Sequence, residues 1–305
     1  MMAPRLIGQD CLEFSRTDRG SSSFDKIATL IDWQPITEIL SPLYSAPKGE
    51  AAWLPLSVFR AMLLAVWYDL SDVKLAEVLD DRMSFRRFCG FSAQEFTPEH
   101  TAFVRFRRLL ISQSLDKALF EAVTVQIKSG TIVDATIIAS QTEHDNEAGW
   151  VKHKGRKAVY GFKVHVGADA TTALVERIAI TPANVNDGRA GPDAVPDGPG
   201  DVFADSPYGG GHFCNAVLAK GGMTRVIETA LWRRDEKEAR ARLEAWNWSI
   251  HRIRGQIEKI FGTWKRSYGL RRMRWRGLAK AAIQIHMMAI SYNLKRTFNI
   301  LAKSV

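Results

Sequence analysis

The chain has 305 residues, of which 46% are hydrophobic, enough for two domains that each bury a core of their own. It carries 42 Lys and Arg against 33 Asp and Glu, a formal net charge of +9 that favours an anionic partner. The cysteines Cys11, Cys89 and Cys214 lack metal-type spacing, which argues against a disulfide framework or a zinc site and favours a reducing cytosol.

The first part of the chain is predicted to be helical. No apolar segment precedes Asp10, so we expect no signal peptide and a cytoplasmic protein. Ser57 precedes the apolar run 58–67, and Ser71 opens a second helix that continues through Val78. These residues lack a convincing alternating pattern, so strands are not expected before residue 130.

A third helix in this part is expected to present a basic face. Thr97-Pro98-Glu99 combines an N-cap, a first-turn proline and a first-turn acid. The helix that follows carries Arg105, Arg107 and Arg108. Short helices with Arg-rich faces are compatible with helix-turn-helix DNA reading, and also with a plain packing bundle.

From residue 130 onwards β-branched and apolar runs replace the helical pattern. They predict strands over 131–138, 159–166 and 174–181, a helix starting near Asp187, a strand over 201–205, a helix over 210–220 and a strand over 224–227. Gly188–Gly200 is rich in Gly, Pro and Asp and is expected to be a surface loop. The apolar stretch 278–294 is interrupted by polar residues, so it reads as a packed helix and not a membrane span.

Two aspartates occupy positions that suit cation binding. Asp134 lies inside the apolar strand 131–138, where a carboxylate is costly unless it is paired or coordinates a cation. Asp205 ends the next short apolar strand just before turn residues, a position where α/β proteins place ligands. A turn or N-cap aspartate is the alternative reading of Asp205.

The last sixty residues carry the positive charge of the chain. Between Trp246 and the C-terminus there are thirteen Lys and Arg and a single carboxylate, Glu258. At about 100° per residue, His251, Arg254, Glu258 and Lys265 fall on one stripe of a helix, beside an apolar face. Ordinary intrahelical ion pairs on a surface helix are the simpler reading, but the lack of other acids points to a carboxylate that binds metal on a helix facing nucleic acid.

These residues together resemble the DDE transposases of bacterial insertion sequences, in the insertion-sequence-five branch. The resemblance rests on the strand Val133–Thr136, the blocks Tyr160–His165, Gly167–Asp169 and Thr181–Asp187, the strand end Ala204–Asp205, and the signature Tyr-(2)-Arg-(3)-Glu-(6)-Lys. Here the signature reads His251, Arg254, Glu258 and Lys265, so a histidine replaces the family's tyrosine. Ser206–Gly209 likewise replaces the Lys-Gly-Tyr turn of many relatives.

The resemblance implies an α/β protein in two domains. Residues 1–128 would form a helical N-terminal DNA-binding domain, and residues 129–305 a ribonuclease-H-like catalytic core, a mixed sheet with flanking helices that continues into basic C-terminal helices. Asp134, Asp205 and Glu258 would be both catalytic and metal-binding, holding two Mg²⁺ or Mn²⁺ ions. The expected partners are double-stranded terminal inverted repeats and target DNA, bound by a homodimer on paired ends in a bacterial, nucleoid-associated setting without a membrane.

Further DNA contacts are expected outside the signature. His251, Arg254 and Lys265 would clamp phosphates near the cut. Basic residues alternate with an aromatic at Arg271, Arg272, Arg274, Trp275 and Arg276, which suits phosphates plus a stacked or unpaired base. A solvated basic turn is the alternative there. His165 either faces the metal site or is a satisfied sheet histidine.

Three functions agree with this reading. The first is a transposase that cleaves the ends of its element and joins the 3′-ends to target DNA. The second is a transposase-derived regulator that binds DNA without cutting, and the retained triad argues against it. The third is a ribonuclease-H-like metal-dependent nuclease, which nothing in the sequence separates from a transposase.

Overall fold

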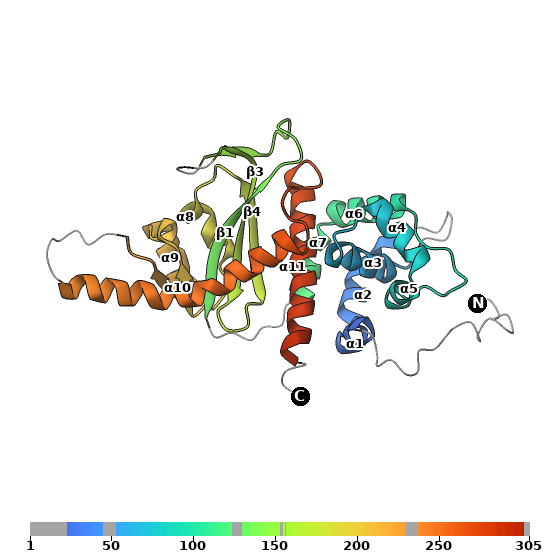
Figure 1. Cartoon of the computed structure of the whole chain (residues 1–305), viewed down its shortest axis with the longest axis horizontal. Helices are drawn as coiled ribbons and strands as arrows, with labels where there is room; N and C mark the ends of the chain where they lie inside the picture. The colour runs from blue at the N-terminus through green and yellow to red at the C-terminus, as the bar shows by residue number, and fades with distance from the viewer. Residues whose placement is uncertain are drawn as a thin grey trace.

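The computed structural model describes residues 23–44, 53–123, 130–152, 155, 157–229 and 237–301. A group of helices lies to one side of a twisted sheet, and the long helix α11 stands between them (Figure 1). The elements before the sheet are α1 (Ser23–Leu30), α2 (Gln34–Leu40), the 3-10 helix η1 (Ser41–Tyr44), α3 (Pro55–Trp67), α4 (Asp72–Asp81), α5 (Met83–Cys89), α6 (His100–Ser112) and α7 (Leu115–Val123). The helical prediction for this part is therefore confirmed over the described residues.

Capping residues set the ends of two of these helices. The Ser71 hydroxyl accepts a hydrogen bond from the Lys74 amide at 3.2 Å, as its predicted N-cap role requires. Gly90 ends α5 with φ of 87°, a left-handed conformation that glycine adopts without a steric penalty. Both caps satisfy backbone groups that a helix end leaves without partners.

Two other helices begin away from their predicted starts. Helix α3 begins at Pro55, so Ser57 is a buried residue of its first turn and not its cap. Proline suits this first position because the missing amide has no partner there in any helix. Helix α6 begins at His100, after the predicted cap Thr97, whose hydroxyl bonds to the carboxylate of Asp80 instead.

Six strands form one mixed sheet. They are β1 (Thr131–Ala139), β2 (Gly149–Val151), β3 (Val159–Asp169), β4 (Val175–Pro182), β5 (Asp201–Ala204) and β6 (Met223–Val226), in the order β2-β3-β1-β5-β6 with β4 pairing to β3. β3 runs antiparallel to β1, whereas β5 and β6 run parallel to it. The predicted strands are confirmed, and the short strand β2 was not predicted.

The remaining elements flank or follow the sheet. They are α8 (Asp187–Ala190), η2 (Gly191–Ala194), η3 (Ser206–Tyr208), α9 (Gly211–Ala219), α10 (Lys237–Arg266) and α11 (Leu278–Leu301). Alternation along β1 divides the core: Ile132 packs with residues of α10 and α11, and Val133 packs with residues around α9. Asp134 follows the same alternation and therefore lies on the α10 side of the sheet.

The stretch Gly188–Gly200 is not the surface loop that was predicted. It forms α8 and η2, and Ala194 and Val195 are buried against the sheet. A Cβ added at Gly167 of β3 would lie 2.0 Å from the carbonyl oxygen of Ala194, so the segment contacts the strand backbone directly. Its Gly and Pro content reflects this close packing and not exposure.

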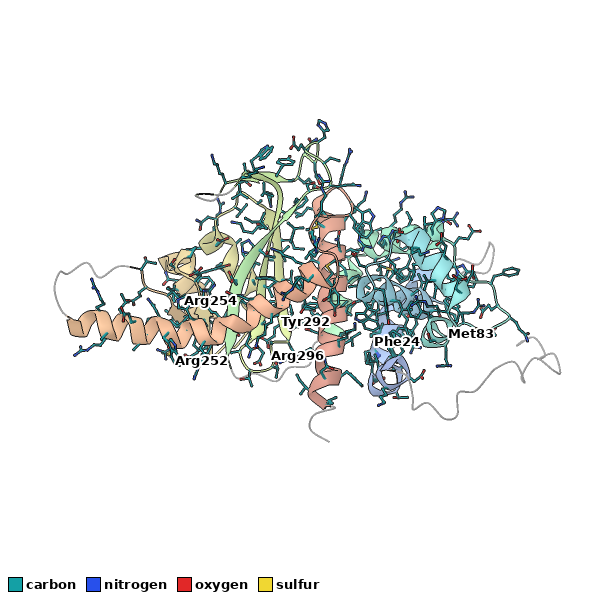
Figure 2. The ribbon with its side chains drawn as sticks, in the orientation of Figure 1. Phe24, Met83, Arg252, Arg254, Tyr292 and Arg296 are labelled. Carbon is teal, nitrogen blue, oxygen red and sulfur yellow. The ribbon has the colours of Figure 1, made fainter. Side chains whose placement is uncertain are left out.

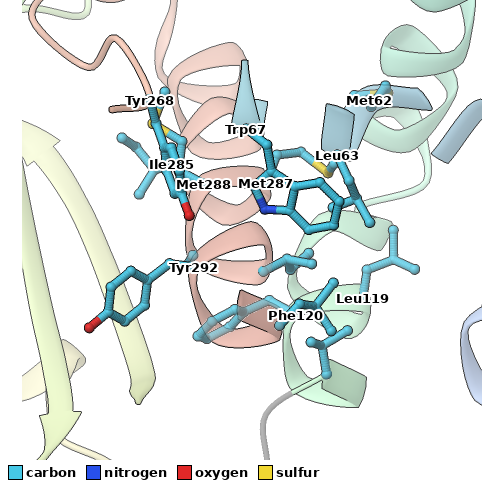
Figure 3. Close-up of a cluster of buried hydrophobic side chains, with 14 of the residues drawn as sticks. Met62, Leu63, Trp67, Leu119, Phe120, Tyr268, Ile285, Met287, Met288 and Tyr292 are labelled. Carbon is cyan, nitrogen blue, oxygen red and sulfur yellow. The ribbon is translucent and has the colours of Figure 1, made fainter. Parts of the chain in front are cut away.

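Helix α11 belongs to the cores of both parts of the chain. The Trp67 indole of α3 donates to the carbonyl oxygen of Ser291 at 2.9 Å, and the Asn293 side chain bonds both backbone groups of Val175 in β4. Figure 3 shows Trp67 and Phe120 of the N-terminal helices among the methionines of α11. One continuous core thus joins the helices to the sheet.

None of the described helices combines the length and the apolar character that crossing a bilayer requires. The predicted domain boundary after residue 128 falls between 124 and 129, outside the described residues.

Candidate active site

The two predicted aspartates are neighbours across adjacent parallel strands. The register pairs Ile132 with Phe203 and Val133 with Ala204, so Asp134 and Asp205 come next on each strand. Both follow the alternation onto the face covered by α10. Asp205 stands just beyond the carboxyl end of β5, as expected for a ligand-binding residue of an α/β protein.

Arg254 of α10 bridges the two carboxylates. Its Nη2 donates to Asp134 Oδ2 at 2.9 Å, and its Nη1 lies 3.4 Å from Asp205 Oδ1. In Figure 2 Arg254 lies on the sheet side of α10, and the neighbouring Arg252 is exposed. The side chain of Arg254 is only 12% exposed, so this is a shielded ion pair and not a surface one.

A backbone amide also donates to each carboxylate, to the other oxygen of Asp134 and to the same oxygen of Asp205 that faces Arg254. Asp134 Oδ1 accepts from the Ala135 amide at 2.8 Å, and Asp205 Oδ1 accepts from the Ser206 amide at 2.9 Å. Asp205 thus also fulfils the turn and cap role that was its alternative reading. Both side chains are fixed in orientation before any ligand arrives.

Two ionised carboxylates at Asp134 and Asp205 are unfavourable unless a positive charge lies near them. Burial raises the pKa of Asp134, the Arg254 guanidinium opposes that rise, and the nearby Asp205 carboxylate adds to it. The arrangement therefore needs a cation between the acids, and in this structure the guanidinium supplies it.

Tyr208 is close enough to Asp134 and Asp205 for their charges to affect its phenol, and the sequence did not predict it as part of the site. Its ring is 1% exposed, and its hydroxyl has no hydrogen-bond partner among the described residues. Burial raises the pKa of the phenol, and the carboxylates of Asp134 and Asp187 raise it further. The signal that could have found it is its place three residues after Asp205.

Glu258, the third predicted ligand, does not join the two aspartates. It is exposed one turn beyond Arg254 on α10 and makes no hydrogen bond or ion pair with other described residues. Over the described ranges, groups of three His, Cys, Asp or Glu that could hold a metal are absent. His251 is exposed and Lys265 is half-buried on the same helix. The four signature residues therefore all lie on α10 but do not gather into one cluster.

His165 lies on the other face of the sheet and not beside the aspartates. It is fully buried, and its Nε2 lies 3.2 Å from the Thr181 hydroxyl, while Nδ1 has no described partner. Burial lowers the pKa of its imidazole to about 4, so the ring is neutral at pH 7. Nearby, Lys163 pairs with Asp187 at 2.8 Å, and the N-cap of α8 is Asn186.

Several side chains of the basic stretch 271–276, before α11, are bonded within the protein. The Arg107 guanidinium lies 4.4 Å from the ring centroid of Trp275, and Arg274 donates to Asp69 and to the Leu70 carbonyl. Arg272 donates to the Ser140 carbonyl at 2.9 Å. Arg271 and Arg276 are exposed.

The basic face predicted for α6 is divided in the same way. Arg107 is 8% exposed and makes a bidentate pair with Asp72 of α4. Arg105 and Arg108 are exposed. Two of the three arginines are therefore placed for contact with a partner, and the third joins α6 to α4 and Trp275.

Comparison with protein families decides the class of this chain. The family model described as Transposase DDE domain matches residues 126–294, more than half of the sequence, a range that includes Asp134, Asp205 and Arg254. The chain belongs to this transposase family. A second model, Transposase domain (DUF772), matches residues 13–109 of the transposase, most of its helical part.

One solved structure matches this chain weakly. The chain of a piggyBac transposase synaptic complex with hairpin DNA is 8% identical to this transposase. The match covers 95% of this chain and 78% of that chain, with a TM-score of 0.49.

Proposed function

We propose that this protein binds the terminal inverted repeats of an insertion sequence, cleaves the DNA ends and joins the 3′-ends to target DNA. The observation that carries the proposal is the pair Asp134 and Asp205, fixed side by side on adjacent strands with Arg254 between them, in a chain of the DDE transposase family. The branch is the insertion-sequence-five branch, and the core is ribonuclease-H-like. Residues 1–128 and 129–305 form the DNA-binding and catalytic domains.

The proposed cofactors are two Mg²⁺ or Mn²⁺ ions, for which the adjacent carboxylates of Asp134 and Asp205 supply ligands. Asp134, Asp205 and Glu258 would hold them, because hard divalent cations prefer carboxylate oxygens. The guanidinium between the two aspartates supports this assignment, since it marks a place where the chain itself needs positive charge. When bound, such ions activate the attacking oxygen and stabilise the leaving oxygen of an in-line displacement.

The basic residues of α10 would hold the DNA. Arg254 presents two donors in a fork that matches a phosphate as well as a carboxylate. It would therefore contact a phosphate near the cut, together with His251 and Lys265. The amides of Ala135 and Ser206 keep the two aspartates oriented while Arg254 exchanges partners.

Double-stranded DNA is the proposed partner, and a homodimer on paired ends is the proposed assembly. Exposed Arg105 and Arg108 of α6 and exposed Arg271 and Arg276 before α11 would contact its phosphates in a nucleoid-associated cytoplasmic setting. Arg272, Arg274 and Trp275 have intramolecular partners, so they would act by shaping that surface.

The test is cleavage of duplex DNA taken from the sequence that flanks the gene. The wild type should cut it in Mg²⁺ and form joined products with a second duplex, whereas D134N, D205N and E258Q should bind without cutting. D81N, which changes an exposed acid of α4, is the matched control. Cutting without joined products would favour the nuclease, and binding without cutting would favour the regulator. If E258Q cut like the wild type, Glu258 would not be a ligand.

A further inference from the structure

A hairpin at the end of the sheet presents an exposed aromatic surface. Trp150 of β2 is 54% exposed, and its ring lies 5.1 Å from that of Tyr160, its paired residue in β3. An indole left in water carries a hydrophobic cost that a partner would remove. The described part of the chain thus leaves the indole of Trp150 largely uncovered, and the half-buried ring of Tyr160 supports it.

The base of this hairpin is rigidly held. The Tyr160 hydroxyl donates to the Asp145 carbonyl at 2.6 Å, and the Asp145 carboxylate accepts from the Gly277 amide at 3.0 Å. A Cβ on Gly149 would lie 2.4 Å from Asn184 Oδ1, so the β2 backbone lies directly against that residue. The backbone that carries Trp150 is therefore already ordered, so a ligand that binds there does not lose free energy in ordering it.

The surroundings of Trp150 are basic. Lys152 and Lys157 of the same hairpin are exposed, as are Arg271 and Arg276 of the adjoining segment. The adjoining segment is tied to the hairpin loop, because the Glu147 carboxylate accepts from the Leu278 amide at 2.7 Å. Glu143 and Glu147 are exposed carboxylates of the loop, but Glu147 is bonded to the adjoining segment and Asp145 is buried. Positive charge around an exposed aromatic suits nucleic acid.

The hairpin has a defined distance from the candidate active site. Trp150 pairs with Tyr160 of β3, and Tyr160 is level with Ser140, six residues beyond Asp134. At about 3.3 Å per residue along the strand and about 4.8 Å across each of the two strand spacings, Trp150 lies about 22 Å from Asp134. Phosphates on one DNA strand follow each other by about 3.4 Å along the helix axis, so the distance corresponds to about six nucleotides.

We infer that Trp150, supported by Tyr160 and flanked by Lys152 and Lys157, stacks on an unpaired base about six nucleotides from the scissile phosphate. The inference rests on the proposed function and adds to it a contact outside the family signature. Both faces of a base in an intact duplex are covered by its neighbours, so the indole gains stacking only where a base is unpaired. Trp275 is not available for this role because Arg107 covers it.

The experiment uses the full chain and two duplexes taken from the DNA that flanks the gene. The cut made by the wild type in Mg²⁺ is mapped first. One duplex then carries an unpaired 2-aminopurine about six nucleotides from that cut, and the other carries it paired. W150A should bind the unpaired duplex about 5- to 150-fold more weakly, lose the quenching of 2-aminopurine, and bind the paired duplex almost unchanged. W150F should retain most of the affinity.

Two controls separate this role from general effects. W248A removes a tryptophan that is 64% exposed on α10, and it should change neither affinity nor quenching. Lys152→Ala and Lys157→Ala should each reduce the slope of log K against log salt concentration by about 0.9. Unchanged quenching in W150A, or an equal loss of affinity for both duplexes, would overturn the inference. Cleavage by the wild type would still support the proposed function in that case. If the wild type neither bound nor cut the DNA, both would fall.

Discussion

Arg254 Nη2 donates a hydrogen bond to Asp134 Oδ2 at 2.9 Å across 120 positions of the sequence. The two side chains are 12% and 21% exposed, so their charges are shielded from water and interact more strongly than on a surface. Two acids on neighbouring strands would repel each other without this partner. The arginine is therefore a structural counter-charge in the described state of the chain, as well as a proposed phosphate ligand.

Replacing Arg254 by alanine should lower the free energy of unfolding by roughly 3 kcal/mol, because it leaves the shielded carboxylate of Asp134, next to Asp205, without a counter-charge. Mg²⁺ should then raise the melting temperature of R254A more than that of the wild type, since it can supply the missing charge. Thermal unfolding with and without Mg²⁺ measures both effects. R252A, on the exposed side of the same helix, should behave like the wild type. Equal stability of R254A and the wild type would refute the counter-charge role.

The buried His165 should make stability depend on pH. Burial lowers the pKa of its imidazole to about 4, against an ordinary value of about 6.5, and outweighs the opposing carboxylate of Asp187. As pH falls below about 6.5, the unfolded chain binds a proton that the folded chain does not. The free energy of unfolding should therefore drop by roughly 3 kcal/mol between pH 6.5 and pH 4.

Urea unfolding at several pH values measures this dependence. H165Q should flatten the profile in that window, and H100Q, which changes an exposed histidine at the start of α6, should not. A profile of the same steepness in H165Q would assign the pH dependence to other groups.

Removing the hydroxyl of Tyr208 should not destabilise the protein. The group is buried without a hydrogen-bond partner among the described residues, so Y208F removes a desolvated polar atom. The expected gain in the free energy of unfolding is about 1 kcal/mol. Y160F is the matched control, because the Tyr160 hydroxyl donates a hydrogen bond, and its loss should cost about 1 kcal/mol. A loss of stability in Y208F would mean that the hydroxyl has a partner in solution.

The arginines of α6 should separate into two classes. R107A should lower the free energy of unfolding by roughly 3 kcal/mol, because it breaks the shielded pair with Asp72 and uncovers Trp275. R105A and R108A should leave stability unchanged and reduce the salt dependence of DNA binding by about 0.9 per lost phosphate contact. Melting curves and a binding series in salt measure the two properties. A stable R107A with weakened DNA binding would reverse the assignment.

The sequence predicted the elements that local patterns determine. The β-branched run around Asp134 and the capping serine at Ser71 depend on neighbouring residues, and both were placed correctly. Strand β2 was missed because its three residues acquire a strand conformation only by pairing with β3. Gly188–Gly200 was misread because its packing depends on close approach to Gly167, which a loop composition does not reveal.

The candidate site was predictable to a similar extent. The spacing along α10 identified Arg254, but not that it would reach both aspartates, because that depends on how the helix crosses the sheet. The alternation of basic and aromatic residues at 271–276 could not reveal that Arg107, from a distant helix, covers Trp275. Trp150 was overlooked because a single aromatic in a short strand carries no pattern, and only its 54% exposure distinguishes it.

Helix α11 is shared between the helices and the sheet, because Trp67 and Val175, from the two parts, are both hydrogen-bonded to it. A flexible connection between two such parts would let the distance between them vary. Under the proposed function, the shared helix would instead set a constant number of base pairs between the recognised sequence and the broken bond.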